Sequence, residues 1–204
     1  RDISLGNRYN NYGIHGTGIS TAVDSLAAIK KYVFDEKSIS AKDLIRAVED
    51  NFEDHYDLWI KLKYHAPKMG NDDDNADNIA VSLLDYFSEL SAGLVNERGG
   101  CYRPGTGSAM YYLWHVKDIG ASADGRKRGE PLSANFSPGL NIKLKGPLSI
   151  IRSFSKPDMK KIMNGGPLTL ELHNSVFRNQ ESIRKVSTLV KAYMDMGGQQ
   201  LQIN

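Results

Sequence analysis

The sequence has 204 residues, of which 25% are charged and 40% hydrophobic, and its formal net charge is +2. A charge so close to neutral argues against binding to nucleic acid or to a membrane surface, and no apolar run reaches the roughly 18 residues of a transmembrane helix. The single cysteine, Cys101, excludes an internal disulfide framework and favours a reducing, cytoplasmic setting.

Apolar residues at helical spacing predict five longer helices, at residues 19–34, 41–52, 54–65, 76–95 and 180–195. Ser40 is the expected N-cap of the second helix, and Pro67 is expected to end the third. A short helix is predicted near 157–162, and buried strands are predicted at 108–114, 167–172 and 199–204. Because helices alternate with buried strands, the fold class is predicted to be α/β.

Three segments are predicted to be irregular. Residues 1–12 are polar, residues 13–18 form a glycine-rich turn, and residues 118–147 form a long loop rich in Gly, Pro and Ser. Loops this long inside a compact domain are uncommon and are usually functional or shared with neighbouring parts. A salt bridge between Arg126 and Glu130 is expected to hold this loop in place.

The segment 71–77 is strongly acidic and has two interpretations. Clustered carboxylates suit Ca²⁺ or Mg²⁺, but the EF-hand pattern is absent because Gly and Glu are missing at its sixth and twelfth positions. The preferred interpretation is that Asp72 to Asp74 cap the helix that begins near residue 76. No metal site is therefore predicted.

Five segments, in this order, resemble those of one enzyme family: YGIHGTG at 12–18, DSLAAIK at 24–30, PKMGNDDDNAD at 67–77, ADGRKRGEPL at 123–132 and GGQQLQIN at 197–204. The family is the glycyl radical enzymes, in the broad pyruvate formate-lyase sense, and the resemblance covers nearly the whole chain. It implies that residues 1–204 are a C-terminal-half fragment of a ten-stranded α/β barrel with outer helices. The glycine-radical region is expected to begin at about residue 139.

The resemblance also implies a chemistry. In this family a separate radical S-adenosylmethionine activating enzyme installs a radical on a backbone glycine; the radical passes to a cysteine, whose thiyl form abstracts hydrogen from the substrate. Neither the Gly-Cys-Val-Glu-like stretch of that cysteine nor the Arg-Val-Ser-Gly-Tyr-like stretch of that glycine occurs here. No catalytic residue and no bound cofactor are predicted, and Cys101 is interpreted as an ordinary buried thiol.

The first residue is not methionine and the last residues continue a strand pattern, so the sequence is expected to be an internal piece of a longer protein, without a signal peptide. Such a piece is expected to be inactive alone. The expected partners are the remainder of the same enzyme or a complementary fragment, the activating enzyme, a small-molecule substrate and a second copy in a homo-oligomer. Nucleic acid and membrane are not expected.

The predicted strand 108–114 carries the candidate substrate residues, because the resemblance implies that the strand at this place lines the barrel cavity. Ser108, Met110 and Tyr112 would share one face, and the other face would consist of Ala109, Tyr111 and Leu113. Which face points inward is open, and plain core packing is the alternative. His15 is a further substrate-binding candidate, with a hydrogen-bonded core histidine as its alternative.

The parent protein is predicted to be an anaerobic lyase that cleaves a C–C or C–X bond of a small substrate. The segments 133–138 and 165–172 resemble the arylacetate decarboxylase branch, which includes 4-hydroxyphenylacetate decarboxylases. A diol dehydratase, a choline lyase and a benzylsuccinate synthase-type enzyme remain alternatives. The alternative of a different class is a non-catalytic or split-subunit fragment.

Overall fold

The computed structural model describes residues 5–204, so the first four residues of the predicted irregular segment 1–12 lie outside the described residues. The strands are β1 (Tyr12–His15), β2 (Tyr102–Gly105), β3 (Leu168–Leu170) and β4 (Leu201–Ile203). The α-helices are α1 (Ile19–Ile29), α2 (Ala41–Glu49), α3 (Tyr56–Ile60), α4 (Asp74–Ser91), α5 (Tyr111–Trp114), α6 (Pro147–Phe154) and α7 (Gln180–Asp195). Short π-helical turns extend α1 and α3, over Lys30–Asp35 and Lys61–His65. Single 3₁₀ turns follow α5 and precede α7, over His115–Lys117 and Asn174–Phe177.

The five longer helices are confirmed, because each depends on a local apolar stripe that any partner surface can bury. Ser40 caps α2 as predicted, and its Oγ accepts a hydrogen bond of 3.0 Å from the Asp43 amide. The acidic segment also caps a helix: Asp73 is the N-cap of α4, and its Oδ1 accepts from the Asn75 amide at 3.0 Å. The interpretation of this segment as a helix cap is therefore confirmed.

The predicted strand at 108–114 is wrong. The segment turns at Ala109, whose φ is +45°, and then forms α5. Its amides bond locally, with Tyr111 N donating to Ser108 O at 2.9 Å and Trp114 N to Met110 O at 3.1 Å. A short apolar run does not distinguish a strand from a helix, so the pattern alone misassigned it. The strand of this region lies earlier, in β2.

The short helix predicted near 157–162 is also misplaced. The helix is α6, which begins with Pro147 at its first position, where a missing amide hydrogen costs nothing. Residues 158–162 form only turns. The predicted glycine-rich turn at 13–18 is partly replaced by strand, because residues 13–15 belong to β1 and only the rest turns.

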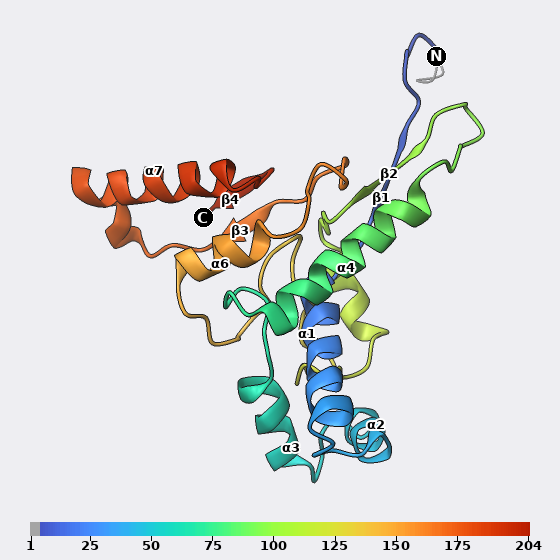
Figure 1. Cartoon of the computed structure of the whole chain (residues 1–204), viewed down its shortest axis with the longest axis vertical. Coiled ribbons are helices and arrows are strands. Elements are labelled where there is room, and N and C mark those ends of the chain that lie inside the picture. The colour runs from blue at the N-terminus through green and yellow to red at the C-terminus, as the bar shows by residue number, and fades with distance from the viewer. Residues whose placement is uncertain (1–4) are drawn as a thin grey trace.

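The strands form two separate parallel pairs, β1 with β2 and β3 with β4 (Figure 1). The α/β class is confirmed, whereas residues 5–204 form a mixed helix and strand assembly without a closed barrel. Figure 1 shows β3 and β4 beside α6 and α7, two helices that contact each other, and it shows α1 crossing α4.

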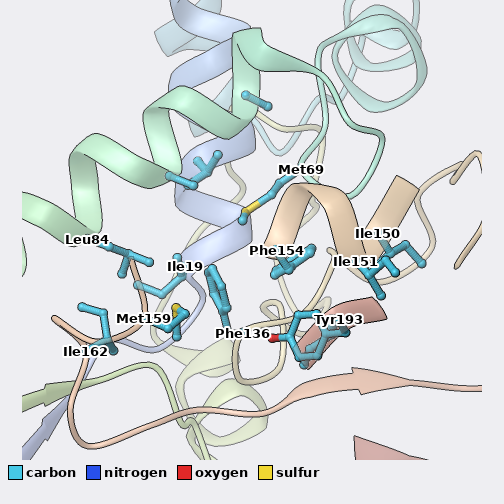
Figure 2. Close-up of a cluster of buried hydrophobic side chains, with 14 of the residues drawn as sticks. Ile19, Met69, Leu84, Phe136, Ile150, Ile151, Phe154, Met159, Ile162 and Tyr193 are labelled. Carbon is cyan, nitrogen blue, oxygen red and sulfur yellow. The ribbon is translucent and has the colours of Figure 1, made fainter. Parts of the chain in front are cut away.

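Two hydrophobic clusters hold the molecule together. The larger one joins α1, α4, α6, α7 and β3, and the smaller one joins the end of α1 to α2 and α3. Phe136, which comes from the long loop, lies fully buried in the middle of the larger cluster (Figure 2). Its ring meets that of Phe154 edge to face, with 4.7 Å between centroids. The loop is thereby tied to the core although it has no regular structure.

The long loop 118–147 is confirmed as irregular from the end of the 3₁₀ turn to α6. The predicted salt bridge within it is wrong, because the Arg126 guanidinium donates to the carbonyl oxygens of Gly120, Lys127 and Glu130. The Glu130 carboxylate instead accepts from the Lys127 amide at 3.0 Å and lies 3.5 Å from Lys63 Nζ. The buried Arg126 guanidinium is thus bound by backbone carbonyls of its own loop and not by the half-exposed Glu130 carboxylate.

Candidate functional site

The sheet of β3 and β4 has one apolar and one polar face. Leu168 and Leu170 are buried in the larger hydrophobic cluster, and Leu201 packs against it. Side chains alternate along a strand, so the intervening residues point the other way. The register pairs Thr169 with Gln202. The amide bonds Asn204 N to Leu170 O and Leu172 N to Asn204 O, each 3.0 Å, continue the ladder and set Glu171 opposite Asn204.

The polar face forms one wall of a groove of about 630 Å³, which we call the central groove. This volume is in the range of small-molecule sites. The start of α6 contributes Pro147 and Ile150, and the long loop contributes the residues of segment 134–144 other than Phe136 and Lys143. The remaining wall comes from the turn before α5 and from α5 itself. Segments distant in the sequence thus meet around this one groove.

Two of the four predicted substrate residues line the central groove. Met110, which is 49% exposed, and Tyr112, which is half-buried, both border it. Tyr112 is anchored through its carbonyl oxygen, which accepts from the Leu132 amide at 3.1 Å. The phenol and the thioether are therefore presented by a backbone that is fixed to the long loop.

Ser108 does not line the groove. It is fully buried, and its Oγ accepts from the Asn135 amide at 2.8 Å and lies 3.2 Å from Asn135 Oδ1. The Ser108 amide in turn donates to Asn135 Oδ1 at 2.8 Å. This reciprocal pair, which we call the Ser108–Asn135 clasp, joins the turn before α5 to the long loop. It fixes the distance between two walls of the groove.

His15 lies at the carboxyl end of β1, exposed, and it is not part of the groove lining. Its Nε2 is 2.6 Å from Asn164 Nδ2. The ring lies over a glycine-lined stretch of backbone, since a Cβ added to Gly105 would be 2.8 Å from the ring atoms Nδ1 and Cε1. The interpretation of His15 as a core histidine is wrong, whereas its contact with a substrate stays a prediction. Cys101, half-buried just before β2, lies 3.3 Å through Sγ from Asn11 Oδ1 and does not line the groove.

A buried charge cluster lies behind the groove. Asp24, on α1, is fully buried, and its Oδ1 accepts from the Met69 amide at 2.7 Å. Its Oδ2 has no hydrogen-bond partner among the described residues and lies close to Gly139, which lines the groove. Burial raises the pKa of Asp24 to about 8, against the opposing effect of Lys68. Burial also lowers the pKa of Lys68, whose Nζ donates to Asp124 O at 2.6 Å.

The polar residues of β3 and β4 were missed by the sequence analysis. Thr169, Glu171, Gln202 and Asn204 all line the groove. A sequence signal for them exists, because both strands alternate apolar and polar residues, as LTLEL at 168–172 and LQIN at 201–204. Their convergence depends on strand pairing, which alternation does not reveal.

The fold and the groove define an α/β segment with a small-molecule-sized site beside a parallel strand pair. Residues 1–114 match the family described as "Pyruvate formate lyase-like", and residues 132–204 match the one described as "Glycine radical". The chain therefore belongs to the pyruvate formate lyase-like family of glycyl radical enzymes.

Individual relatives agree with this assignment. The chain is 35% identical to trans-4-hydroxy-L-proline dehydratase of Clostridioides difficile, over 98% of this chain and 25% of that protein. It is 26% identical to indoleacetate decarboxylase of Tractidigestivibacter scatoligenes, over 98% of this chain and 26% of the relative. The glycerol-bound B12-independent glycerol dehydratase of Clostridium butyricum superimposes with a TM-score of 0.93 at 33% identity, over 98% of this chain and 25% of that one.

The chain thus spans about a quarter of the length of the relatives it matches. Within residues 5–204, no helix combines the length and the apolar character that crossing a bilayer requires.

Proposed function

We propose that this chain is part of a glycyl radical enzyme that cleaves a C–X or C–C bond of a small substrate, with the central groove as one wall of the substrate cavity. The observation that carries the proposal is the groove itself, a mixed polar and apolar surface of small-molecule size in a chain of this family. Concave sites of this kind, with a few convergent polar groups, are the usual place for a ligand. A radical reaction also needs a closed site, which the rest of the ten-stranded barrel would complete.

Met110 and Tyr112 are the proposed substrate contacts of this chain, because both border the groove. Ser108 acts through the Ser108–Asn135 clasp and so positions them. A contact between His15 and the substrate requires a surface supplied from outside this chain, because His15 is exposed away from the groove lining. The glycyl radical would reside on a residue outside this chain and would be installed by a radical S-adenosylmethionine activating enzyme.

Elimination is the favoured reaction type. The relative named a dehydratase is 35% identical and the one named a decarboxylase 26% identical, so decarboxylation of an arylacetate has the weaker support. The proposed enzyme works in the anaerobic cytoplasm, on a small molecule, as a homo-oligomer.

Electron paramagnetic resonance tests the proposal. The complete protein is activated anaerobically with its radical S-adenosylmethionine partner, and a doublet from a glycyl radical is expected, followed by product formation from a vicinal diol. A protein that gives no doublet under conditions that activate a known relative would contradict the proposal. It would favour the alternative of a non-catalytic or split-subunit fragment. Size-exclusion chromatography would then test whether the chain associates with the complementary fragment.

A further inference from the structure

We infer that Ser133 and Ser137 are positioning residues of the central groove. Together they hold residues 132–137, which we call the groove strap, between α1 and β3, so that the walls of the groove keep a fixed relative position. The importance of this position for a substrate rests on the proposed function, whereas the coupling between α1 and the groove is a property of the chain itself. The strap belongs to the long loop and has no regular secondary structure.

The backbone of the groove strap is satisfied by other parts of the chain. Buried irregular backbone is costly unless its polar groups find partners. Four amides of the strap donate to atoms outside it: Leu132 to Tyr112 O at 3.1 Å, Ser133 to Thr21 Oγ1 at 2.9 Å, Asn135 to Ser108 Oγ at 2.8 Å and Phe136 to Pro167 O at 3.1 Å. The conformation of the strap therefore depends on several distant segments at once.

Ser133 joins the amino end of the strap to α1. This helix begins after Gly18, which as the N-cap has no side chain to bind the free amides of the first turn. The fully buried Ser133 takes this role, because its Oγ accepts from the Thr21 amide at 3.1 Å. In return the Ser133 amide donates to Thr21 Oγ1 at 2.9 Å. The strap thus caps α1 from a distant part of the sequence.

Ser137 joins the carboxyl end of the strap to β3. The Leu168 amide donates towards β4, to Gln200 O at 3.0 Å. Amides alternate in direction along a strand, so the next amide, that of Thr169, points away from β4. It donates to Ser137 Oγ at 2.8 Å. The strap thereby covers the edge of β3 that β4 leaves open.

Asn135, in the middle of the strap, has a left-handed backbone with a φ of +48°. Residues other than glycine rarely adopt this conformation, and such strain persists only where the surroundings over-determine it. Here the Ser108–Asn135 clasp holds the side chain, and the bonds of Ser133 and Ser137 hold the strap on both sides. Loosening either end should therefore let Asn135 leave this conformation and release the clasp.

The three polar residues of the strap bind three different elements. Ser133 binds α1, Asn135 binds the turn before α5, and Ser137 binds β3. Asn135 and Ser137 line the groove, and Ser133 does not, so Ser133 acts on the groove through the other two. A disturbance at α1 should therefore reach both β3 and the turn that leads to Met110 and Tyr112.

A matched pair of variants at Thr21 tests this coupling, because Thr21 lies on α1 and does not line the groove. Thr21→Val removes the hydroxyl that accepts from the Ser133 amide, and Thr21→Ser keeps it. Hydrogen exchange of the complete, unactivated protein is measured by mass spectrometry. In Thr21→Val the peptides that cover 108–114, 132–137 and 167–172 should exchange about fivefold faster, as expected when one hydrogen bond no longer opposes local opening. In Thr21→Ser all three should exchange at the wild-type rate.

Ser137→Ala tests the same coupling from the other end of the strap. It removes the acceptor of the Thr169 amide, so exchange should rise in the first turn of α1 as well as in β3. This variant decides if Thr21→Val does not fold. Thr188→Val is the control, because the Thr188 hydroxyl donates to Arg184 O within α7, and it should leave the three peptides unchanged.

The outcomes separate this inference from the proposed function. Faster exchange that stays within α1 and residue 133 in Thr21→Val and within β3 in Ser137→Ala overturns the inference. Faster exchange that includes α7, or that is equal in Thr21→Val and Thr21→Ser, also overturns it, because either result would indicate a general loss of packing. A protein that shows the expected coupling but no glycyl radical doublet overturns the radical function and leaves the positioning role of the strap in place.

Discussion

The sheet of β1 and β2 and the sheet of β3 and β4 share parallel pairing, but their surroundings differ. Glycines allow close backbone approach around the first sheet: a Cβ on Gly100 would be 1.9 Å from Asn10 O, and one on Gly105 would be 2.9 Å from Gly165 O. The second sheet has one face in the core and leaves the other, polar face to the central groove. The first sheet is held by close contacts between backbone segments, which we call the backbone joint. The second sheet presents polar side chains to the groove. The central groove lies at the second sheet.

The largest effect is expected at the backbone joint. Gly166 has a φ of +155°, and a Cβ there would be 1.9 Å from Thr106 Oγ1 and 2.7 Å from the Thr106 carbonyl carbon. Gly166→Ala should lower the free energy of unfolding by about 3 kcal/mol or more, because overpacking and left-handed strain each cost about 1–3 kcal/mol. Gly120→Ala, with nothing within 4 Å, is the control for urea denaturation and should change little. Equal losses of unfolding free energy in Gly166→Ala and Gly120→Ala would show that close backbone packing at Gly166 does not stabilise the fold.

The next effect concerns pH and the buried Asp24 that adjoins the groove loop. The ordinary carboxyl pKa is 3.8, whereas burial raises the pKa of Asp24 to about 8 in the folded protein. Between these values the folded state holds one more proton than the unfolded state, so stability falls as pH rises from about 4 to about 8 and then levels off. The slope contributed by Asp24 is at most about 1.4 kcal/mol per pH unit.

Asp24→Asn should remove this slope, because the amide oxygen can still accept from the Met69 amide and does not titrate. Urea denaturation between pH 5 and pH 8 should show the wild-type protein losing stability relative to the variant as pH rises. Lys68 and Asp124 face the same carboxyl group, so the comparison is made as a difference between the two proteins. A constant difference across this range would mean that Asp24 is ionised throughout.

A smaller effect is expected at the Ser108–Asn135 clasp. Ser108→Ala leaves the part-buried Asn135 amide without its acceptor, which should cost about 1–3 kcal/mol of stability. It should also weaken glycerol binding, since the clasp sets the positions of Met110 and Tyr112. Ser187→Ala is the control, because that exposed hydroxyl bonds only within α7. A stability loss without any change in binding would show that the clasp does not shape the groove.

The helices could be predicted because each is a local pattern. The stripe of α7 and the Ser40 cap of α2 are readable within one segment. The misassigned segment is apolar from Ala109 to Trp114, so it carries no clear period, and the Gly and Pro residues at 104–107 stand before the turn at Ala109 and not in it. The start of α6 carries a local signal, because Gly146 precedes the helix and Pro147 occupies its first turn, where proline is favoured.

The groove could not be predicted in the same way. It requires β3 to pair with β4 across the whole of α7, and it requires Phe136 to anchor an irregular loop in the core. Both are long-range packing events that no local pattern encodes. Ser108 illustrates the limit, since its parity with Met110 and Tyr112 suggested a shared face, whereas the turn places it inside and the other two along the groove.

The smallest effect on stability, and the most specific one, is expected on the polar face. Thr169→Val replaces an unpaired buried hydroxyl by a methyl group of the same shape, so stability should stay unchanged or rise by about 1 kcal/mol. Glycerol affinity should fall about three- to tenfold, as expected for one lost hydrogen bond. Thermal denaturation gives the stability, and a ligand-observed NMR titration with glycerol gives the affinity. A variant with unchanged or higher stability and lower glycerol affinity would show that this hydroxyl serves a ligand and not the fold. A variant with lower stability and unchanged glycerol affinity would show that the polar face of β3 and β4 is structural, like the contact between β1 and β2.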